Sequence, residues 1–114
     1  MITKDPLEAK GDEDEAIAEY REALRLDRSH FRAHARLGML LDHTDNVDGA
    51  IAEYRQAVNL NPSDASVHYR LGRALRDKGD KQAALEELHK ASSLEPQNAT
   101  FRDAYQKVYV EGQR

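Results

Sequence analysis

The feature of this sequence that most constrains its fold is an internal repeat of 34 residues. The hexapeptide AIAEYR at residues 16–21 recurs without change at residues 50–55, and a weaker copy follows around Ala84. Self-similarity at this period indicates units that cannot bury a hydrophobic face alone and must stack on one another. Other residues recur at the same offset: Leu37-Gly38 and Leu71-Gly72, and Pro62 and Pro96.

Each unit reads as two helices separated by short polar breaks. Ser29 and Asn98 are the expected N-caps, because their side chains can accept from the first free backbone N–H groups. Pro62 ends a helix, since proline disfavours helical geometry in the residue before it. The hydrophobic period and these signals predict helices over 13–26, 30–43, 47–59, 64–78, 81–94 and 99–110.

The beginning of the chain fits the repeat less well. Gly11-Asp12 is expected to open helix 13–26. Residues 1–10 are expected to be irregular, or to form a short helix that Pro6 begins, because proline is tolerated at a first helical position.

Gly38 and Gly72 lie in the middle of predicted helices and need a reason. Glycine costs about 1 kcal/mol relative to alanine in a helix interior, so Gly38 and Gly72 are expected to allow close approach of a neighbouring helix. The repeated segments that are expected to pack against these glycines each carry small residues on both sides of one large residue. The expected large side chains at this contact are Tyr20, Tyr54 and Leu88.

This combination of period, glycines, alanines and prolines resembles the tetratricopeptide repeat (TPR) family. The resemblance implies an all-α, right-handed α-solenoid of antiparallel helix pairs, a superhelix forming a single domain over residues 1–114. There are departures from the family pattern: His34 and His68 replace the usual aromatic, and Gln106 stands where glycine is expected. The implied division is a second helix of a partial repeat at 11–28, full repeats at 31–64 and 65–98, and a C-terminal capping helix at 99–111.

Composition excludes several functional classes. The formal net charge of -4 opposes a general nucleic-acid binder, and the absence of cysteine excludes thiolate metal sites. No apolar run has the length of a signal peptide's core or a membrane span, so we expect a cytoplasmic protein without a membrane partner. No phosphate loop, nucleophile constellation or metal-spaced cluster occurs. We therefore expect no enzyme activity, cofactor or metal.

The family resemblance implies that the first helix of each pair lines a concave groove where partner peptides lie. Arginines on one face of these helices would bind carboxylates bidentately, so we expect a protein or peptide partner that is anionic. The alternative is a solvated face whose arginines pair with local carboxylates such as Asp42 and Asp77. The residues expected in the groove are Arg32, Arg36, Tyr69, Arg70, Arg73 and Lys107.

Chaperone-binding members of the family hold a C-terminal carboxylate with a Lys/Asn/Arg clamp. Arg70 fits the place of the last arginine of that clamp. Arg36 stands where the asparagine would be, and Ser66 stands where a lysine would be. The resemblance to the clamp is partial, and chaperone binding is not expected.

Other titratable residues have simpler expected roles. His34 and His68 are expected to be packing residues, because two histidines with no nearby carboxylate make a poor zinc site. The acidic run at residues 12–15 is expected to interact favourably with the positive, N-terminal end of a helix dipole. Glu19, Glu53 and Glu87 are expected on a solvated outer face.

The C-terminal helix leaves an alternative function open. Tyr109 and Val110 are expected to be exposed at the open end of the stack, whereas capping repeats normally present a polar outer face. The chain could then be a structural or oligomerisation segment that acts through its end faces. It would form a weak homo-oligomer through the C-terminal helix, or be one piece of a longer solenoid.

Overall fold

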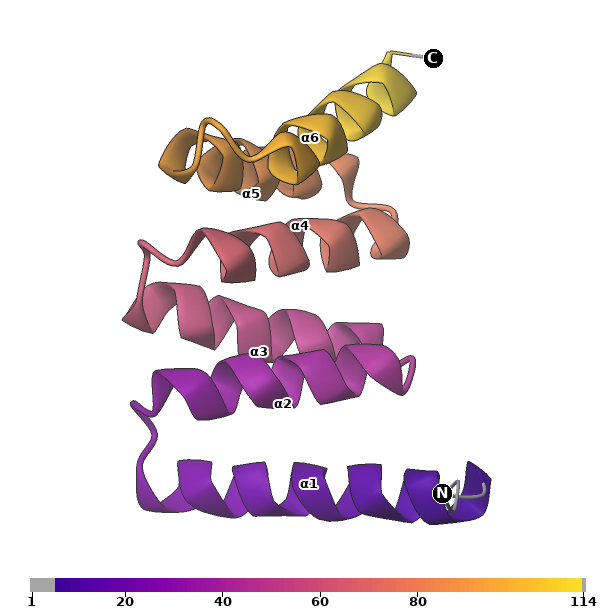
Figure 1. Ribbon diagram of the computed structural model, residues 1–114, viewed down its shortest axis with the longest axis vertical. Helices are drawn as coiled ribbons and strands as arrows, with labels where there is room; N and C mark the ends of the chain where they lie inside the picture. The colour runs from indigo at the N-terminus through magenta and orange to yellow at the C-terminus, as the bar shows by residue number, and fades with distance from the viewer. Residues whose placement is uncertain (1–5, 114) are drawn as a thin grey trace.

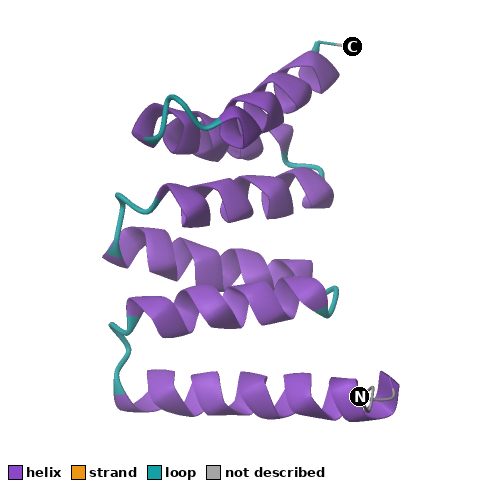
Figure 2. Cartoon of the chain, in the orientation of Figure 1, coloured by secondary structure: helices purple, strands orange, loops and turns teal. Residues whose placement is uncertain are grey.

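The computed structural model describes residues 6–113, and all regular secondary structure in this range is α-helical. Residues 1–5, included in the expectation for segment 1–10, lie outside this part. No strand occurs within 6–113 (Figure 2), and no helix there is long and apolar enough to cross a membrane. The helices are α1 (Pro6–Leu26), α2 (Phe31–His43), α3 (Val47–Leu60), α4 (Ala65–Lys78), α5 (Lys81–Leu94) and α6 (Ala99–Gly112).

The helices stack in chain order along the longest axis of the molecule. Figure 1 shows α1 at one end and α5 with α6 at the other. Each helix packs mainly on its neighbours in the chain, most extensively within the pairs α2–α3 and α4–α5, and α4 also touches α6. The predicted all-α solenoid of helix pairs is therefore confirmed.

Side-chain caps begin five of the helices, by accepting from a backbone N–H three residues on. Asn98 accepts from Phe101 at 3.2 Å, as predicted. The prediction for Ser29 is wrong, because the Nδ1 of His30 accepts from the Ala33 N–H at 3.1 Å and caps α2. The Ser29 hydroxyl instead donates to Asp27 at 2.8 Å. The other side-chain caps are Asn46, Asp64 and Asp80.

The first helix differs from its prediction. It begins at Pro6 and runs without a break through Gly11-Asp12 to Leu26, so this dipeptide lies inside α1 and does not open a helix. The same dipeptide at Gly79-Asp80 does turn the chain, because Gly79 adopts a left-handed φ of 97°. α1 continues through Gly11, at a cost of about 1 kcal/mol for the glycine.

Gly38 and Gly72 lie where helices of one pair come closest. A Cβ built on Gly38 would come within 2.7 Å of the Tyr54 ring, and one on Gly72 within 2.7 Å of Leu88 Cγ. Tyr54 and Leu88 are fully buried there. The predicted role of these glycines is thus confirmed, and each pair has a large side chain seated over a glycine.

The ionisation of Tyr54 gives the fold a predicted pH dependence. Burial, with the nearby Asp42 carboxylate, raises the pKa of Tyr54 from 10.0 to about 12. The folded chain thus holds the phenolic proton more tightly than the unfolded chain does. This contribution to the free energy of unfolding is full below pH 10 and is lost as the pH rises through 12.

Denaturant unfolding of the wild type and of Tyr54→Phe, measured from pH 9 to 12, tests this dependence. The Phe variant should lack part of the alkaline loss of stability. Identical alkaline slopes for the two proteins would contradict the assignment to Tyr54.

Candidate protein-binding groove

A hollow between α2 and α4 collects half of the residues expected in the groove. Arg32 and Arg36 enter it from α2 and Arg70 enters it from α4. Its volume is about 360 Å³, and apolar atoms of Phe31 and Met39 contribute to its lining. Arg36 and Arg70, 34 residues apart in sequence, therefore lie on one hollow. The remaining lining residues are Ala35, Asp64, Ser66 and Val67.

A second hollow, between α4 and α6, collects the other half. Tyr69, Arg73 and Lys107 line its volume of about 450 Å³. The guanidinium carbon of Arg73 lies 5.6 Å from the centre of the Tyr69 ring, a cation–π distance. Tyr69 also packs on Phe101, with ring centres 4.9 Å apart. The two hollows along α2, α4 and α6 are called the groove below.

The charges of the groove are mostly free of local partners. No carboxylate of the described residues forms an ion pair with Arg32, Arg36 or Arg73. The arginine that is paired, Arg76, binds Glu111 at 2.7 and 3.2 Å. This contact lowers the pKa of Glu111. Arg76 therefore follows the alternative, in which arginines of this face pair with local carboxylates. Its partner Glu111 was not among the expected ones.

Arg70 differs from the other groove arginines in its surroundings. It is half-buried and, with Asp42, lies near the hydroxyl of Tyr54, whose pKa both residues influence. That hydroxyl has no hydrogen bond of good geometry to any described residue. Arg70 is thus anchored beside the core of the α2–α3 pair, while Arg36 faces it from solvent.

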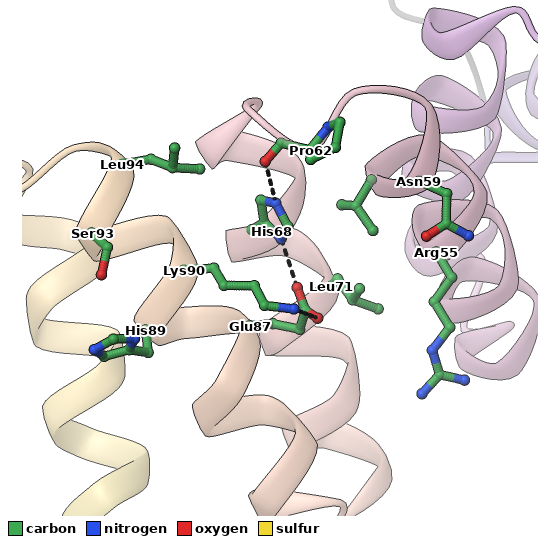
Figure 3. A pocket seen from close by; sticks show the side chains of 11 residues that line it. Arg55, Asn59, Pro62, His68, Leu71, Glu87, His89, Lys90, Ser93 and Leu94 are labelled. Carbon is green, nitrogen blue, oxygen red and sulfur yellow. Dashed lines mark hydrogen bonds and ion pairs between the residues drawn. The ribbon is translucent and has the colours of Figure 1, made fainter.

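The two repeat histidines are buried and fully hydrogen-bonded. His68 Nδ1 lies 2.6 Å from Glu87, and its Nε2 lies 2.8 Å from the carbonyl oxygen of Pro62 (Figure 3). His34 makes the same contacts with Glu53, at 2.7 Å, and with the carbonyl of Arg28, at 2.8 Å. Because a carboxylate and a carbonyl only accept, the ring satisfies both when each nitrogen carries a proton.

These pairs correct two expectations. Each histidine does have a nearby carboxylate, and Glu53 and Glu87 are half-buried partners and not part of a solvated face. The repeated spacing of 19 residues between histidine and glutamate was the signal that the sequence offered. No group of three metal-ligating side chains occurs in the described part of the chain.

A further hollow lies among α3, α4 and α5 and was missed from the sequence. Its volume is about 680 Å³, and Figure 3 shows Arg55 on one wall and His89 and Lys90 on the other. Arg55 and His89 are 34 residues apart and so occupy the same repeat position. This register is the feature of the sequence that could have predicted the hollow. Lys90 is occupied by an ion pair of 3.3 Å with Glu87.

The C-terminal residues expected at an end face are exposed. Tyr109 and Val110 each keep 44% of their surface exposed. The Tyr109 ring stacks on Tyr105, with centres 6.2 Å apart. Val110 lines a hollow of about 490 Å³ on the outer side of α6.

Three family models match the chain. One described as TPR repeat covers residues 45–75, and two described as tetratricopeptide repeat cover 65–98 and 7–30. No curated protein matches the sequence.

Solved structures match the whole arrangement of helices. A crystal structure of MamA has a TM-score of 0.87 at 28% identity, covering 98% of this chain and 67% of that one. MamA 41-end from Desulfovibrio magneticus RS-1 has a TM-score of 0.83 at 25% identity, covering 92% of this chain and 59% of that one. The chain thus spans about three fifths of that MamA structure.

A third structure was solved with a peptide. The first TPR of Spaghetti (RPAP3), bound to the HSP90 peptide SRMEEVD, has a TM-score of 0.86 at 21% identity. The match covers 93% of this chain and 84% of that one. At this identity the likeness is one of fold alone.

Proposed function

Because the chain belongs to the tetratricopeptide repeat family, we propose that it is a protein-interaction scaffold that binds an acidic or carboxylate-bearing peptide in its Arg-lined groove. One observation carries the proposal: Arg36 and Arg70 line one hollow between α2 and α4, and no described carboxylate forms an ion pair with either of them. The proposal assigns no catalytic step, cofactor or metal to the chain.

The chemistry of this hollow suits a carboxylate next to an apolar side chain. Guanidinium groups on opposite walls can each bind a carboxylate through two parallel N–H donors. Phe31, Met39 and Val67 supply apolar surface beside them. A peptide with acidic and aliphatic residues close together would satisfy both parts of the lining.

The second hollow extends the same site along α4. Tyr69 offers an apolar ring with a polar tip, and its position is fixed by Phe101 on one side and Arg73 on the other. Lys107 adds a cation from α6. A peptide lying across α2, α4 and α6 would meet positive charge at both hollows.

The solved neighbours are consistent with this proposal. A domain of this fold is bound to a peptide whose sequence ends in EEVD, so the fold accommodates an acidic segment. That likeness does not identify the partner here, and the incomplete clamp at Arg36 and Ser66 favours a different acidic peptide.

Replacing Arg36 and Arg70 together with alanine tests the groove. The probe is a fluorescent peptide of alternating leucine and glutamate with a free C-terminal carboxylate. We expect the Kd to rise about a hundredfold, since hydrogen bonds to charged groups each contribute about 1.5–3 kcal/mol. Wild-type binding should also weaken as salt is added.

The matched control is Arg21→Ala with Arg55→Ala. It removes the same charge from exposed positions of α1 and α3, outside the two hollows. Thermal melts should show all variants folded. Undiminished binding by the Arg36/Arg70 variant, or an equal loss in the control, would refute the groove assignment.

A further inference from the structure

The two ends of the solenoid present complementary halves of one repeat. α1 corresponds to the second helix of a pair, and no first helix covers it among the residues that the structure describes. Ala50, Tyr54 and Ala57 of α3, which packs on α2 and α4, are completely buried. Their counterparts in α1, 34 residues earlier, are only half-buried: Ala16, Tyr20 and Ala23.

At the other end, α6 is a first helix with no second helix over it within the described part of the chain. Leu75 of α4 is 2% exposed because α5 covers it, whereas its counterpart Tyr109 in α6 is 44% exposed. Leu71 is likewise buried, and its counterpart Tyr105 is half-buried. α6 therefore exposes aromatic side chains at the positions that a second helix would bury.

The open face of α1 is hollowed where a first helix would lie. Ala16 and Tyr20 form one wall of a hollow of about 370 Å³, and residues of α2, Met39 and Leu40 among them, form the other. In the stack, each first helix lies against the second helix of its pair, and α6 also touches α4, the first helix before it. This hollow, between α1 and α2, thus has the setting of a first helix.

Charge complementarity indicates which helix fits it. Inside the chain, His34 binds Glu53 and His68 binds Glu87, each joining the two helices of one pair. In the same register, the next position on α6 is Arg102, and the preceding position on α1 is Glu19. Both are exposed, and neither has an ion pair among the described residues. A helix pair formed from α6 and α1 would set Arg102 opposite Glu19.

We propose that α6 of one copy docks on α1 of a second copy, forming a composite helix pair in the register of the internal repeats. The contact joins different surfaces of the two copies, so each copy keeps one free α6 and one free α1. Such a contact does not close on itself and gives open, growing assemblies. The hollow beside α1 shares Arg36 and Met39 with the peptide groove, but Arg70 and Arg73 line the groove alone, so the two proposals can fail separately.

Gln106 limits the strength of this contact. It takes the place of Gly38 and Gly72, where a Cβ would come within 2.7 Å of the large side chain of the partner helix. In the composite pair Gln106 would meet Tyr20, whose half-exposed ring must turn aside. The association is therefore weak and reversible, and Gln106 is the residue that sets it.

Sedimentation equilibrium of the chain over a hundredfold range of concentration tests the proposal. The wild type should show a weight-average mass that keeps rising beyond a dimer. Gln106→Gly should strengthen association by about tenfold, because it removes a side chain that overpacks the contact. A gain in association cannot be produced by unfolding alone if the thermal melt shows the variant folded.

A charge exchange identifies the register. Arg102→Glu alone and Glu19→Arg alone should each weaken association, and an equimolar mixture or the double variant should restore it. A chain that stays monomeric, in the wild type and in Gln106→Gly alike, would overturn the proposal and leave the end faces to helices of another protein. A dimer that grows no further would also overturn it.

The peptide-binding variant separates the two proposals. Arg70→Ala with Arg73→Ala should weaken peptide binding and leave self-association unchanged. If these changes reduced association as strongly as Arg102→Glu, the contact would lie in the groove and the composite pair would be refuted.

Discussion

Replacing Tyr54 with alanine is expected to lower the free energy of unfolding by about 3–5 kcal/mol, the usual cost of removing a large aromatic side chain from a core. Tyr54 is completely buried and its ring covers Gly38 at the closest point of the α2–α3 pair. The surrounding residues belong to two different helices and cannot collapse into the space without separating the pair. Such a loss is a large part of the roughly 5–15 kcal/mol that stabilises a domain.

Two matched variants control for this result in urea unfolding experiments. Tyr20→Ala removes the same side chain from the same repeat position in α1, where it is only half-buried, so its cost should be much smaller. Tyr54→Phe should be close to neutral, because the hydroxyl has no hydrogen bond of good geometry to any described residue. Equal costs for Tyr20→Ala and Tyr54→Ala would contradict the packing described above.

His68→Ala is expected to cost about 3 kcal/mol, the lower end of the range for breaking a buried pair. The change removes both imidazole nitrogens, so the Glu87 carboxylate loses its contact with Nδ1 and the Pro62 carbonyl loses its contact with Nε2. The Glu87 side chain is 14% exposed, so water replaces the lost bond poorly. Lys90 still contacts this carboxylate at 3.3 Å, which keeps the cost from being larger.

The equivalent change in the preceding repeat gives an internal comparison. His34→Ala should cost less than His68→Ala, because the Glu53 side chain is 24% exposed and can be hydrated more easily. His89→Ala, at an exposed position of α5, serves as the control for histidine removal and should change stability little. The order His68, His34, His89 in chemical denaturation is the expected result, and a reversed order of the first two would refute this explanation.

The helices were predictable because their signals are local. Apolar spacing, caps such as Asn98 and the proline breaks act within a few residues, and the helix bounds differ from the predicted ones by two residues or fewer except at α1. Gly11-Asp12 misled the prediction, because the same dipeptide at Gly79-Asp80 turns the chain between two helices, α4 and α5, that pack on each other. At Gly11-Asp12 the chain stays within one helix, α1. Ser29 failed as a cap because its hydroxyl bonds to Asp27.

The candidate site was predictable only in part. Positions 34 residues apart fall on neighbouring first helices, and for that reason Arg36 and Arg70 were expected together, and they line the same hollow. Whether an arginine is free depends on side chains far away in sequence, such as Glu111 beside Arg76. The hollow among α3, α4 and α5 was not predicted, because the family resemblance implied a binding site on the first helices only.

The sequence by itself determined that the chain is a stack of helix pairs, since a repeat of 34 residues with glycines opposite large side chains has that solution for burying its apolar faces. Only the tertiary structure decided which polar side chains find partners and which faces stay open. His68 and Glu87 meet. Among the described residues, Arg36 keeps no ion pair and the faces of α1 and α6 have no covering helix. These outcomes depend on distances between helices, and the spacing of residues along one chain does not contain them.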